Sequence, residues 1–434
     1  MGNTAEQNLI VDLHVHSHYS RATSRECTLA GLYRWGKVKG INVIGTGDFT
    51  HPQWFKELRE ELVPDAASGL YRLRPEVAAE IDDRLPTPIA DQPLCFVPTV
   101  EISTIYSKHG RVRKLHQLVI MPSLETAAEL NGRLERIGNL ASDGRPILGL
   151  DSKELLRHTL EVSPEALYVP AHIWTPWFGL FGSRSGFDTL EEAYEELAPK
   201  VRAIETGLSS DPPMNWRLSQ LEGLAVISNS DAHSPQKLGR EATLLHTQLR
   251  YDDIIGGIKT NDKRLDGTIE FFPEEGKYHY DGHRECGVRL SPEETHQLNG
   301  ICPKCGKPLT VGVDYRVLEL ADQPVGYQPT APKRVEYIIP LVEILGELAG
   351  RGPATKGVQE HYWQLIGQLG SEFAILRELP LAQIQSVDPL LATAIERLRA
   401  GQVVREPGYD GIFGTIKVFE SAADRASAQA QLPL

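Results

Sequence analysis

The chain has 434 residues, of which 41% are hydrophobic and 24% are charged, as in an ordinary soluble globular protein with room for two or three domains. No stretch approaches the roughly 18 consecutive apolar residues of a membrane span, so we expect no membrane partner. The formal net charge of −13 argues against a protein that grips long stretches of nucleic acid through counterion release, although bound metal ions can reverse the sign locally.

The cellular setting is suggested by the N-terminus and the cysteines. Met1 to Glu6 hold no basic region followed by an apolar run, so no secretory signal is expected. The chain has five cysteines, and two of them stand in a Cys-Pro-Lys-Cys unit, which does not suit a disulfide framework. We therefore expect a reducing, cytoplasmic location.

Short apolar runs alternate with amphipathic segments from residue 8 to about residue 270. The runs cover residues 9–11, 41–45, 95–100, 115–121, 167–171, 203–206 and 224–228, and amphipathic segments cover 124–137 and 189–197. About seven β-α alternations predict a barrel-like α/β domain over residues 1–270, with functional residues at the carboxyl ends of its strands. Residues 60–92 break the rhythm and are expected to form a lid or insertion.

The remainder of the chain divides into two further predicted domains. Residues 271–330 are polar, rich in turns and hold three cysteines, whereas residues 331–434 return to helical periodicity. We predict helices at 335–348, 358–369 and 390–400, a turn at 407–414, a short strand at 416–419 and disorder after residue 421.

Two acid-and-histidine motifs stand at the ends of predicted strands. His14 and His16 are spaced by two residues, as are Asp231 and His233. On a strand this spacing directs both side chains of a pair to the same face. Each motif therefore offers two ligands to one cavity, which indicates a hydrolase with several metal ions.

Other polar residues stand at the ends of the predicted strands or, in one case, within a strand. They are Asp48, His51, Glu101, His116, His172 and Glu205. Imidazole and carboxylate are the ligands of zinc, manganese and iron sites. One histidine at a strand end is ordinarily structural, but so many at the same end of successive strands indicate a shared metal centre.

The cysteine-rich segment carries a pair of zinc knuckles. Cys302 and Cys305 form one knuckle, and His283 with Cys286 form the other, with fifteen residues between the two knuckles. Each knuckle has a two-residue spacer and a trailing glycine, which permits the tight turn around a metal. We predict one structural zinc ion, with His283 as the fourth ligand and His279 as the alternative.

The first and last motifs resemble those of the polymerase-and-histidinol-phosphatase (PHP) superfamily of metal-dependent phosphoesterases. The resemblance implies a distorted (β/α)7 barrel that binds up to three ions. It implies one metal site at His14, His16, Glu101 and Asp231. It also implies that Glu101 bridges to a second ion held by His116 and His172.

The third site of the superfamily is altered in this sequence. His233 is retained, but Phe49 stands where the family has a histidine after Asp48. His51, Asp48 or His18 are the possible substitutes, so two or three catalytic ions, zinc, manganese or magnesium, are expected. Paired ions about 3.5–4 Å apart activate water and stabilise the attacking and leaving oxygens at phosphorus. In that chemistry we expect Asp231, Glu101 and Arg21 to be catalytic. Arg21 and Arg184 either bind phosphate oxygens or are exposed on the surface.

The whole chain resembles the endonuclease Q branch of that superfamily. The resemblance is carried by residues 281–288, 302–310 and 407–414 and by the order of barrel, zinc lobe and helical tail. It implies cleavage of DNA on the 5′ side of deaminated bases (uracil, hypoxanthine, xanthine) and of abasic sites. DNA with damaged bases is then the expected partner, with repair or replication proteins as further candidates.

Recognition of a damaged base calls for stacking surfaces and hydrogen-bonding groups. Trp174, Trp177 and Phe178 follow His172 and predict either a stacking wall or a buried hydrophobic lid. Glu205, Ser209 and Ser210 offer groups for base edges. Basic residues that either track the DNA backbone or belong to a solvated hairpin are Lys108, Arg111, Arg113 and Lys114.

Two other functions are compatible with parts of this pattern. A small-molecule phosphatase of the histidinol-phosphate type needs the metal ligands but neither the zinc lobe nor the helical tail. A noncatalytic DNA-repair scaffold needs the tail but not the ligands. Because both features are present, the sequence favours a lesion-specific endonuclease over either alternative.

Overall fold

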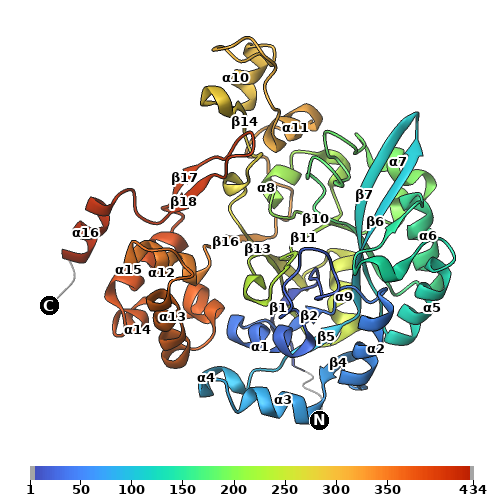
Figure 1. Ribbon diagram of the computed structural model, residues 1–434, viewed down its shortest axis with the longest axis horizontal. Coiled ribbons are helices and arrows are strands. Elements are labelled where there is room, and N and C mark those ends of the chain that lie inside the picture. Colours follow the sequence, from blue (N-terminus) through green and yellow to red (C-terminus); the bar gives the residue numbers. More distant parts are fainter. Residues whose placement is uncertain (1–4, 431–434) are drawn as a thin grey trace.

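The computed structural model describes residues 5–430 and has mixed α/β architecture (Figure 1), which confirms the predicted class. The largest sheet has eight strands in the order β16-β13-β12-β1-β2-β5-β4-β3. Its strands are β1 (Gln7–Asp12), β2 (Val43–Gly45), β3 (Leu62–Asp65), β4 (Leu70–Leu73), β5 (Cys95–Val97), β12 (Ala242–Thr247), β13 (Leu265–Glu270) and β16 (Arg334–Tyr337). Strands β1, β2 and β5 run parallel, as the β-α alternation predicts.

The other strands of the predicted barrel form two smaller sheets. A four-stranded sheet has the order β8-β6-β7-β9, and β10 pairs with β11. The strands are β6 (Thr99–Lys108), β7 (Arg111–Ile120), β8 (Ile147–Leu148), β9 (Leu167–Pro170), β10 (Ala203–Glu205) and β11 (Ala225–Ile227). The hydrogen-bonded ladders therefore fall into three sheets, and a closed seven-stranded barrel stays a prediction.

Helices connect these strands. They are α1 (Leu29–Lys39), α2 (Pro52–Glu61), α3 (Pro75–Asp82), α4 (Thr87–Ala90), α5 (Leu124–Leu134), α6 (Ser152–Val162), α7 (Leu190–Tyr194), α8 (Pro212–Asn215) and α9 (Tyr251–Thr260). Ser123 begins α5 with a capping box that also uses the Thr126 side chain. Residues 60–92, predicted as a lid or insertion, hold the end of α2, the β3–β4 hairpin and the helices α3 and α4.

The cysteine-rich segment forms a lobe that projects from the rest of the molecule (Figure 1). Its elements are β14 (Asp281–His283), β15 (Val288–Leu290), α10 (Pro292–Gln297) and α11 (Val313–Leu320). The apolar cluster inside the lobe consists of Val288, Cys302 and Leu309 with Cys286 and Leu290 against it. So small a core stabilises little on its own.

The C-terminal region is helical, with one small hairpin. It contains α12 (Leu341–Ala349), α13 (Lys356–Leu369), α14 (Leu381–Gln385), α15 (Pro389–Arg399), β17 (Val404–Glu406), β18 (Thr415–Lys417) and α16 (Ala422–Ala430). Short 3₁₀ turns lie at Leu140–Ser142, Glu195–Lys200, Ser219–Leu221, Pro235–Lys237, Pro273–Glu275 and Arg284–Cys286, and a π-helical turn lies at Ala374–Glu378.

Two predictions for this region were wrong. Residues 335–337 belong to strand β16 rather than to a helix, because they pair with β13, and α12 begins only after Pro340. The segment after residue 421, predicted to be disordered, forms α16 up to residue 430. Two hydrogen bonds of 2.7 and 3.0 Å from the Arg397 guanidinium to the Asp424 carboxylate hold α16 against the domain. The last four residues lie outside the described part of the chain.

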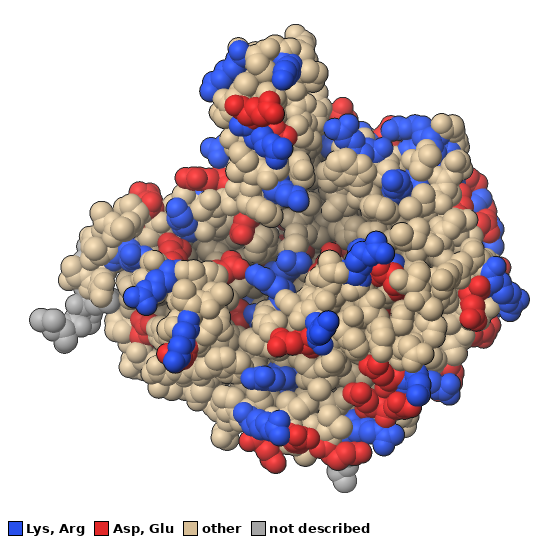
Figure 2. Space-filling model, in the orientation of Figure 1, with Lys and Arg blue, Asp and Glu red and all other residues tan. Residues whose placement is uncertain are grey.

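The projecting lobe, the C-terminal helices and the strand ends border one face. In the space-filling view this face is hollowed near its middle, and Lys and Arg side chains stand on its rims (Figure 2).

Candidate metal centre and active site

The two acid-and-histidine motifs lie side by side beyond the end of β1. Val15 forms a parallel bridge with Ala232, and the His16 N–H donates a 3.0 Å hydrogen bond to the Ala232 carbonyl. The Leu13 N–H donates to Asn229 Oδ1 at 2.7 Å. Backbone pairing therefore brings together ligands that are 215 residues apart in the chain.

The first predicted ligand set is brought together. Potential ligand atoms of His14, His16, Glu101 and Asp231 all lie within 4.8 Å of one another. His16 Nε2 is 3.0 Å from Asp231 Oδ1, and His14 Nε2 is 3.6 Å from Glu101 Oε2. His14 Nε2 is buried and lacks a hydrogen-bond partner within the described residues, although it faces carboxylate oxygens. A cation satisfies such a donor set, so these residues fit a metal ion.

The second predicted set shares Glu101 with the first. Glu101, His116 and His172 form a separate group of potential ligands. Glu101 Oε1 lies 2.5 Å from His116 Nδ1 and 2.9 Å from His172 Nε2. Its other oxygen, Oε2, faces the first group, at 3.3 Å from His16 Nε2. One carboxylate therefore stands between two groups of imidazoles, which is the arrangement of a bridging ligand.

Two further carboxylates lie behind the imidazoles. His14 Nδ1 donates to both Glu205 oxygens at 3.0 Å, and the His172 backbone N–H donates to Glu205 Oε2 at 2.9 Å. His16 Nδ1 donates to Asp48 Oδ1 at 3.1 Å. Such bonds fix which ring nitrogen faces a metal and raise its basicity. Because Glu205 and Asp48 are buried and engaged in this way, they orient ligands, and Glu205 does not face a substrate base as expected.

Burial and mutual charge shift the pKa values of the first group in opposite directions. Burial alone lowers the pKa of His14 and His16, but neighbouring carboxylates outweigh it and raise both well above the ordinary value. Burial alone raises the pKa of Asp231, yet His14 and His16 bring it below the ordinary range. Burial likewise raises the pKa of Glu101, but the charges of His116 and Arg145 outweigh it and bring this pKa well below the ordinary value. The carboxylates are therefore ionised, and a cation that binds here displaces protons from imidazoles.

Three residues at the site have left-handed backbone conformations. The φ angles are 50° at Asp48, 31° at His172 and 46° at Asp231. Such conformations are rare for residues other than glycine and cluster at functional sites. Gly207 is required beside them, since a Cβ atom there would lie 2.3 Å from His172 Cβ.

The residues proposed for a third ion do not gather into a third ligand group within residues 5–430. His233 Nδ1 donates to the Asp231 carbonyl at 2.9 Å, and its ring lies 4.5 Å from that of His16. His51 stacks on Tyr19, and His18 Nδ1 donates to the Cys27 carbonyl at 3.2 Å. His233 therefore stands next to the first group, whereas the recorded contacts of His51 and His18 are with Tyr19 and Cys27.

An arginine that the sequence reasoning missed reaches the metal ligands. Arg145 Nη1 lies 3.0 Å from Glu101 Oε2, and the side chain is 28% exposed. The Arg21 side chain is instead 86% exposed and approaches Asp143 at 3.9 Å, so the structure does not bring it to the ligand groups, and its catalytic role stays a prediction. Arg145 is aimed inward because Gly144 packs on Asp48, where a Cβ atom would lie 2.3 Å from Oδ2. The Asp-Gly pair before Arg145 is the turn signal that could have drawn attention to it.

The aromatic loop after His172 is divided between core and surface. Trp174 is 1% exposed, and its Nε1 donates to Asn215 Oδ1 at 2.8 Å, so in this structure it packs in the core, as in the alternative of a buried lid. Trp177 is 51% exposed, with the Arg184 guanidinium 5.9 Å from its ring. Phe178 packs on the ligand His116, with ring centroids 4.4 Å apart. Trp177 and Phe178 thus remain available beside the ligands.

Several other predicted substrate contacts are internal. The Ser210 hydroxyl is buried and donates to the Thr206 carbonyl at 3.0 Å, whereas Ser209 is half-buried. Lys108 is buried in ion pairs with Asp151 and Glu195, and Arg113 is buried against Phe187. Both basic side chains are engaged by these local partners and are therefore not free to contact a DNA backbone. Of the predicted basic set, Arg111 is exposed, and Lys114 is half-buried next to the ring of Phe178.

The lobe brings its four predicted zinc ligands together. His283, Cys286, Cys302 and Cys305 form one group, in which Cys305 Sγ lies 3.7 Å from His283 Nδ1. Burial favours the neutral thiol of Cys302, but backbone N–H groups of Lys304 and Cys305 bring its pKa below the ordinary value. His279 is outside this group and buried. The geometry therefore favours His283 over His279 as the fourth ligand.

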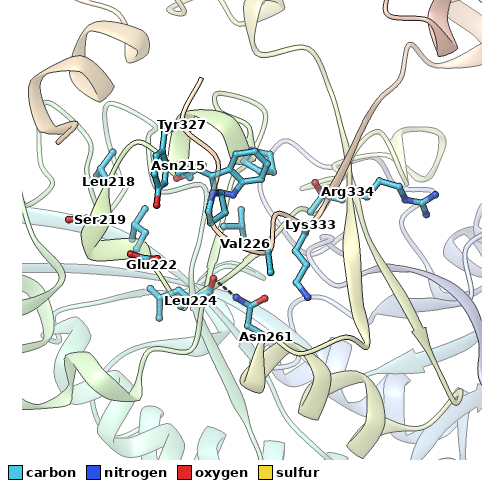
Figure 3. A pocket seen from close by; sticks show the side chains of 17 residues that line it. Asn215, Leu218, Ser219, Glu222, Leu224, Val226, Asn261, Tyr327, Lys333 and Arg334 are labelled. Atoms are coloured by element: carbon cyan, nitrogen blue, oxygen red, sulfur yellow. Dashed lines mark hydrogen bonds between the residues drawn. The ribbon is translucent and has the colours of Figure 1, made fainter. Parts of the chain in front are cut away.

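A separate pocket of about 80 Å³ lies away from these ligands. Figure 3 shows Leu224, Val226 and Tyr327 among its lining residues, and a 3.1 Å hydrogen bond from Asn261 to the Leu224 carbonyl beside it. Since none of the metal-ligand candidates lines it, this pocket is not part of the candidate active site.

Comparisons with known sequences cover most of the chain. A model of the MJ0043 C-terminal domain family matches residues 340–402. The uncharacterized protein MJ0043 of Methanocaldococcus jannaschii is 32% identical over 275 residues, which cover 60% of this chain and 34% of that protein. This chain thus spans about a third of that relative. The uncharacterized protein YqxK of Bacillus subtilis is 29% identical over 431 residues, covering 95% of this chain and 100% of that protein.

Two crystal structures resemble the structure of this chain over nearly its whole length. The lesion-specific endonuclease PfuEndoQ from Pyrococcus furiosus has a TM-score of 0.82 and 30% identity, covering 97% of this chain and 99% of that chain. Endonuclease Q in complex with a 27-mer duplex substrate with an abasic lesion at the active site has a TM-score of 0.80 and 30% identity. This match covers 95% of this chain and 97% of that chain. The likeness thus includes the ligand-bearing strands, the lobe and the C-terminal helices together, and the chain belongs to the endonuclease Q family.

Proposed function

We propose that this protein is a DNA repair endonuclease that hydrolyses the phosphodiester bond 5′ to deaminated bases and abasic sites with a multinuclear metal centre. The observation that carries the proposal is Glu101, whose two oxygens face two different groups of imidazoles. A chain that is similar to endonuclease Q along 97% of its length supports the choice of substrate.

The donor set suits particular ions. The two groups together offer four imidazoles and two carboxylates, which favours zinc or manganese over magnesium because magnesium prefers oxygen ligands. Two such ions would be held by His14, His16, Glu101 and Asp231 on one side and by Glu101, His116 and His172 on the other. When bound, divalent ions activate water and neutralise charge at the phosphorus.

The protein's own groups position the phosphodiester and keep the ligands in place. Arg145 reaches Glu101 with one guanidinium nitrogen and is still partly exposed. Arginine presents several N–H donors in a planar fork that matches phosphate oxygens. We therefore propose that Arg145, in place of Arg21, binds the scissile phosphate. Glu205 and Asp48 hold the imidazole rings of His14 and His16 in position.

The charge of the whole chain is compatible with DNA as the substrate. Although the net charge is −13, several Lys and Arg side chains stand around the central hollow among Asp and Glu side chains (Figure 2). A few such cations can contact a short stretch of phosphates beside a metal centre. Trp177, exposed beside His116 and Phe178, offers a surface on which a base can stack.

The proposal is tested with end-labelled duplexes that carry a single uracil, hypoxanthine or abasic site, beside an undamaged duplex and a phosphomonoester. We expect incision immediately 5′ to the lesion that is lost in Asp231→Asn and in the presence of a chelator. Release of phosphate from the monoester with all DNA intact would contradict the proposal and support a small-molecule phosphatase.

A further inference from the structure

A turn in the C-terminal region is held rigidly against the entry to the lobe. The backbone N–H groups of Gly408, Gly411 and Gly414 donate to the carbonyls of Glu274, Lys277 and Glu275, at 2.8, 2.9 and 3.0 Å. The glycines at 408 and 414 are needed because a Cβ atom at either position would lie about 2.5 Å from backbone atoms of the other strand of the turn. The tip of residues 411–413 is thus fixed by its base.

This rigid tip presents its apolar side chains to solvent. Ile412 is 41% exposed and Phe413 is 70% exposed. Because the turn is anchored through its backbone, these two adjacent apolar side chains are presented to solvent in a defined position. The turn, residues 407–414, is called the aromatic turn below.

The segment that anchors the aromatic turn passes close to the loop that follows strand β10. A Cβ atom on Gly276, which is in the segment that anchors the turn, would lie 3.9 Å from the Leu208 carbonyl. Leu208 follows strand β10, whose last residue Glu205 holds His14. The hairpin β17–β18 that carries the turn lies between the lobe and the C-terminal helices (Figure 1).

One lysine lies near the exposed ring, and two arginines stand on the part of the lobe that adjoins the aromatic turn. Lys277 Nζ lies 5.9 Å from the ring centre of Phe413, and the Arg284 backbone N–H donates to Asp410 Oδ2 at 2.7 Å. Arg284 and Arg289 are exposed on the adjoining strand and turn of the lobe. An aromatic ring flanked by lysine and arginine suits a nucleic acid, because the ring stacks on bases while the cations contact phosphates.

We propose that Phe413 enters the base stack of duplex DNA beside the lesion and so helps to extrude the damaged nucleotide toward the metal ligands. The inference rests on the proposed function. An enzyme that acts on one nucleotide of a duplex has to unstack it, and an inserted apolar side chain stabilises the gap that remains. Phe413 is therefore a positioning residue for duplex substrates and does not contribute to the hydrolytic step itself.

Substrate geometry provides the decisive test. We expect Phe413→Ala to lower kcat/KM for a uracil-containing duplex about tenfold or more, and to change it less than twofold for the same lesion in a single strand, where no base pair has to open. Phe413→Trp is expected to retain duplex cleavage because the indole also stacks. Val325→Ala is the matched control, since Val325 is 76% exposed and lies in the segment after the lobe.

A second readout follows base unstacking without cleavage. In an Asp231→Asn background, a duplex with 2-aminopurine next to the uracil is expected to fluoresce more strongly on binding, and Phe413→Ala should abolish that increase. Equal cleavage of duplex by Phe413→Ala and wild type, or equal losses on duplex and single strands, would overturn the inference. If the wild type cuts no damaged DNA, the proposed function itself fails, which is a different outcome.

Discussion

Arg145 and Arg21 stand close together in space but differ in what they contact. Arg145 bonds the carboxylate shared by the two ligand groups, whereas Arg21 extends into solvent. We expect Arg145→Ala to lower kcat about 100-fold, the size of effect seen when one charge-stabilising donor is removed, and Arg21→Ala to change it less than about twofold. The measurement is single-turnover cleavage of lesion DNA with saturating metal.

Chemical rescue separates a phosphate-binding role for Arg145 from a purely structural one. Added guanidinium ion should restore part of the activity of Arg145→Ala, because the vacated space beside Glu101 can accept it. Equal losses in Arg145→Ala and Arg21→Ala would refute the assignment.

Glu205 acts on the metal centre through two ligand residues. Its oxygens accept hydrogen bonds from His14 Nδ1 and from the His172 backbone. Loss of a carboxylate partner of this kind weakens metal binding about 10–100-fold, so Glu205→Gln should shift the metal dependence of activity by that factor. Competition with a fluorescent chelator measures the shift directly. The exposed Glu222→Gln serves as control, and unchanged metal affinity in Glu205→Gln would contradict this role.

At the scale of the secondary-structure elements, strands β12 and β13 place two carboxylates opposite each other. Ala242 pairs with Ile269, and continuing that antiparallel register sets Glu241 against Glu270. Both are fully buried, and burial followed by their mutual repulsion raises the pKa of Glu241 well above its usual value. Each also has one oxygen that lacks a hydrogen-bond partner in residues 5–430.

This pair predicts how stability depends on pH. The folded state keeps protons that the unfolded carboxyls release, so the free energy of unfolding falls as pH rises above the ordinary value of 4.5. Glu241→Gln removes one acid and should stabilise the protein by about 1–3 kcal/mol at pH 8, with a smaller gain near pH 5. Thermal unfolding at both pH values measures this, and an equal gain at both would contradict it.

Local spacing was sufficient to predict most strands and to select the polar residues at their ends, whereas the division of these residues into two ligand groups came from the family resemblance. Alternating polarity and strand-end position depend on local spacing alone, and the structure brings His14, His16 and Asp231 into one group of potential ligands. The positions of Arg145 and Trp174 could not be predicted from the sequence, because long-range packing decides which arginine turns inward and which tryptophan is buried. Strand β16 was missed for the same reason, since its partner β13 is about 70 residues away.

At the scale of the whole molecule, the lobe depends on its metal more than the rest of the chain does. Its apolar cluster is built around Val288, Cys302 and Leu309, so a bound ion has to supply much of its stability. Cys302→Ser should lose about one zinc per chain and expose residues 271–330 to proteases, while the metal centre keeps its ions. Elemental analysis and limited proteolysis give these two readouts. Cys95→Ala, which alters a buried cysteine outside the group, is the control, and full zinc retention in Cys302→Ser would argue against a structural ion.

The bridge between Val15 and Ala232 also has a consequence for biosynthesis. The ligands beside it, His16 and Asp231, are 215 residues apart, so a growing chain on the ribosome lacks a complete first ligand group until the second motif has emerged. An amino-terminal fragment released early by stalling or proteolysis can carry His14, His16 and Glu101 but lacks Asp231. The first ligand group is therefore complete only when more than half of the polypeptide has been made.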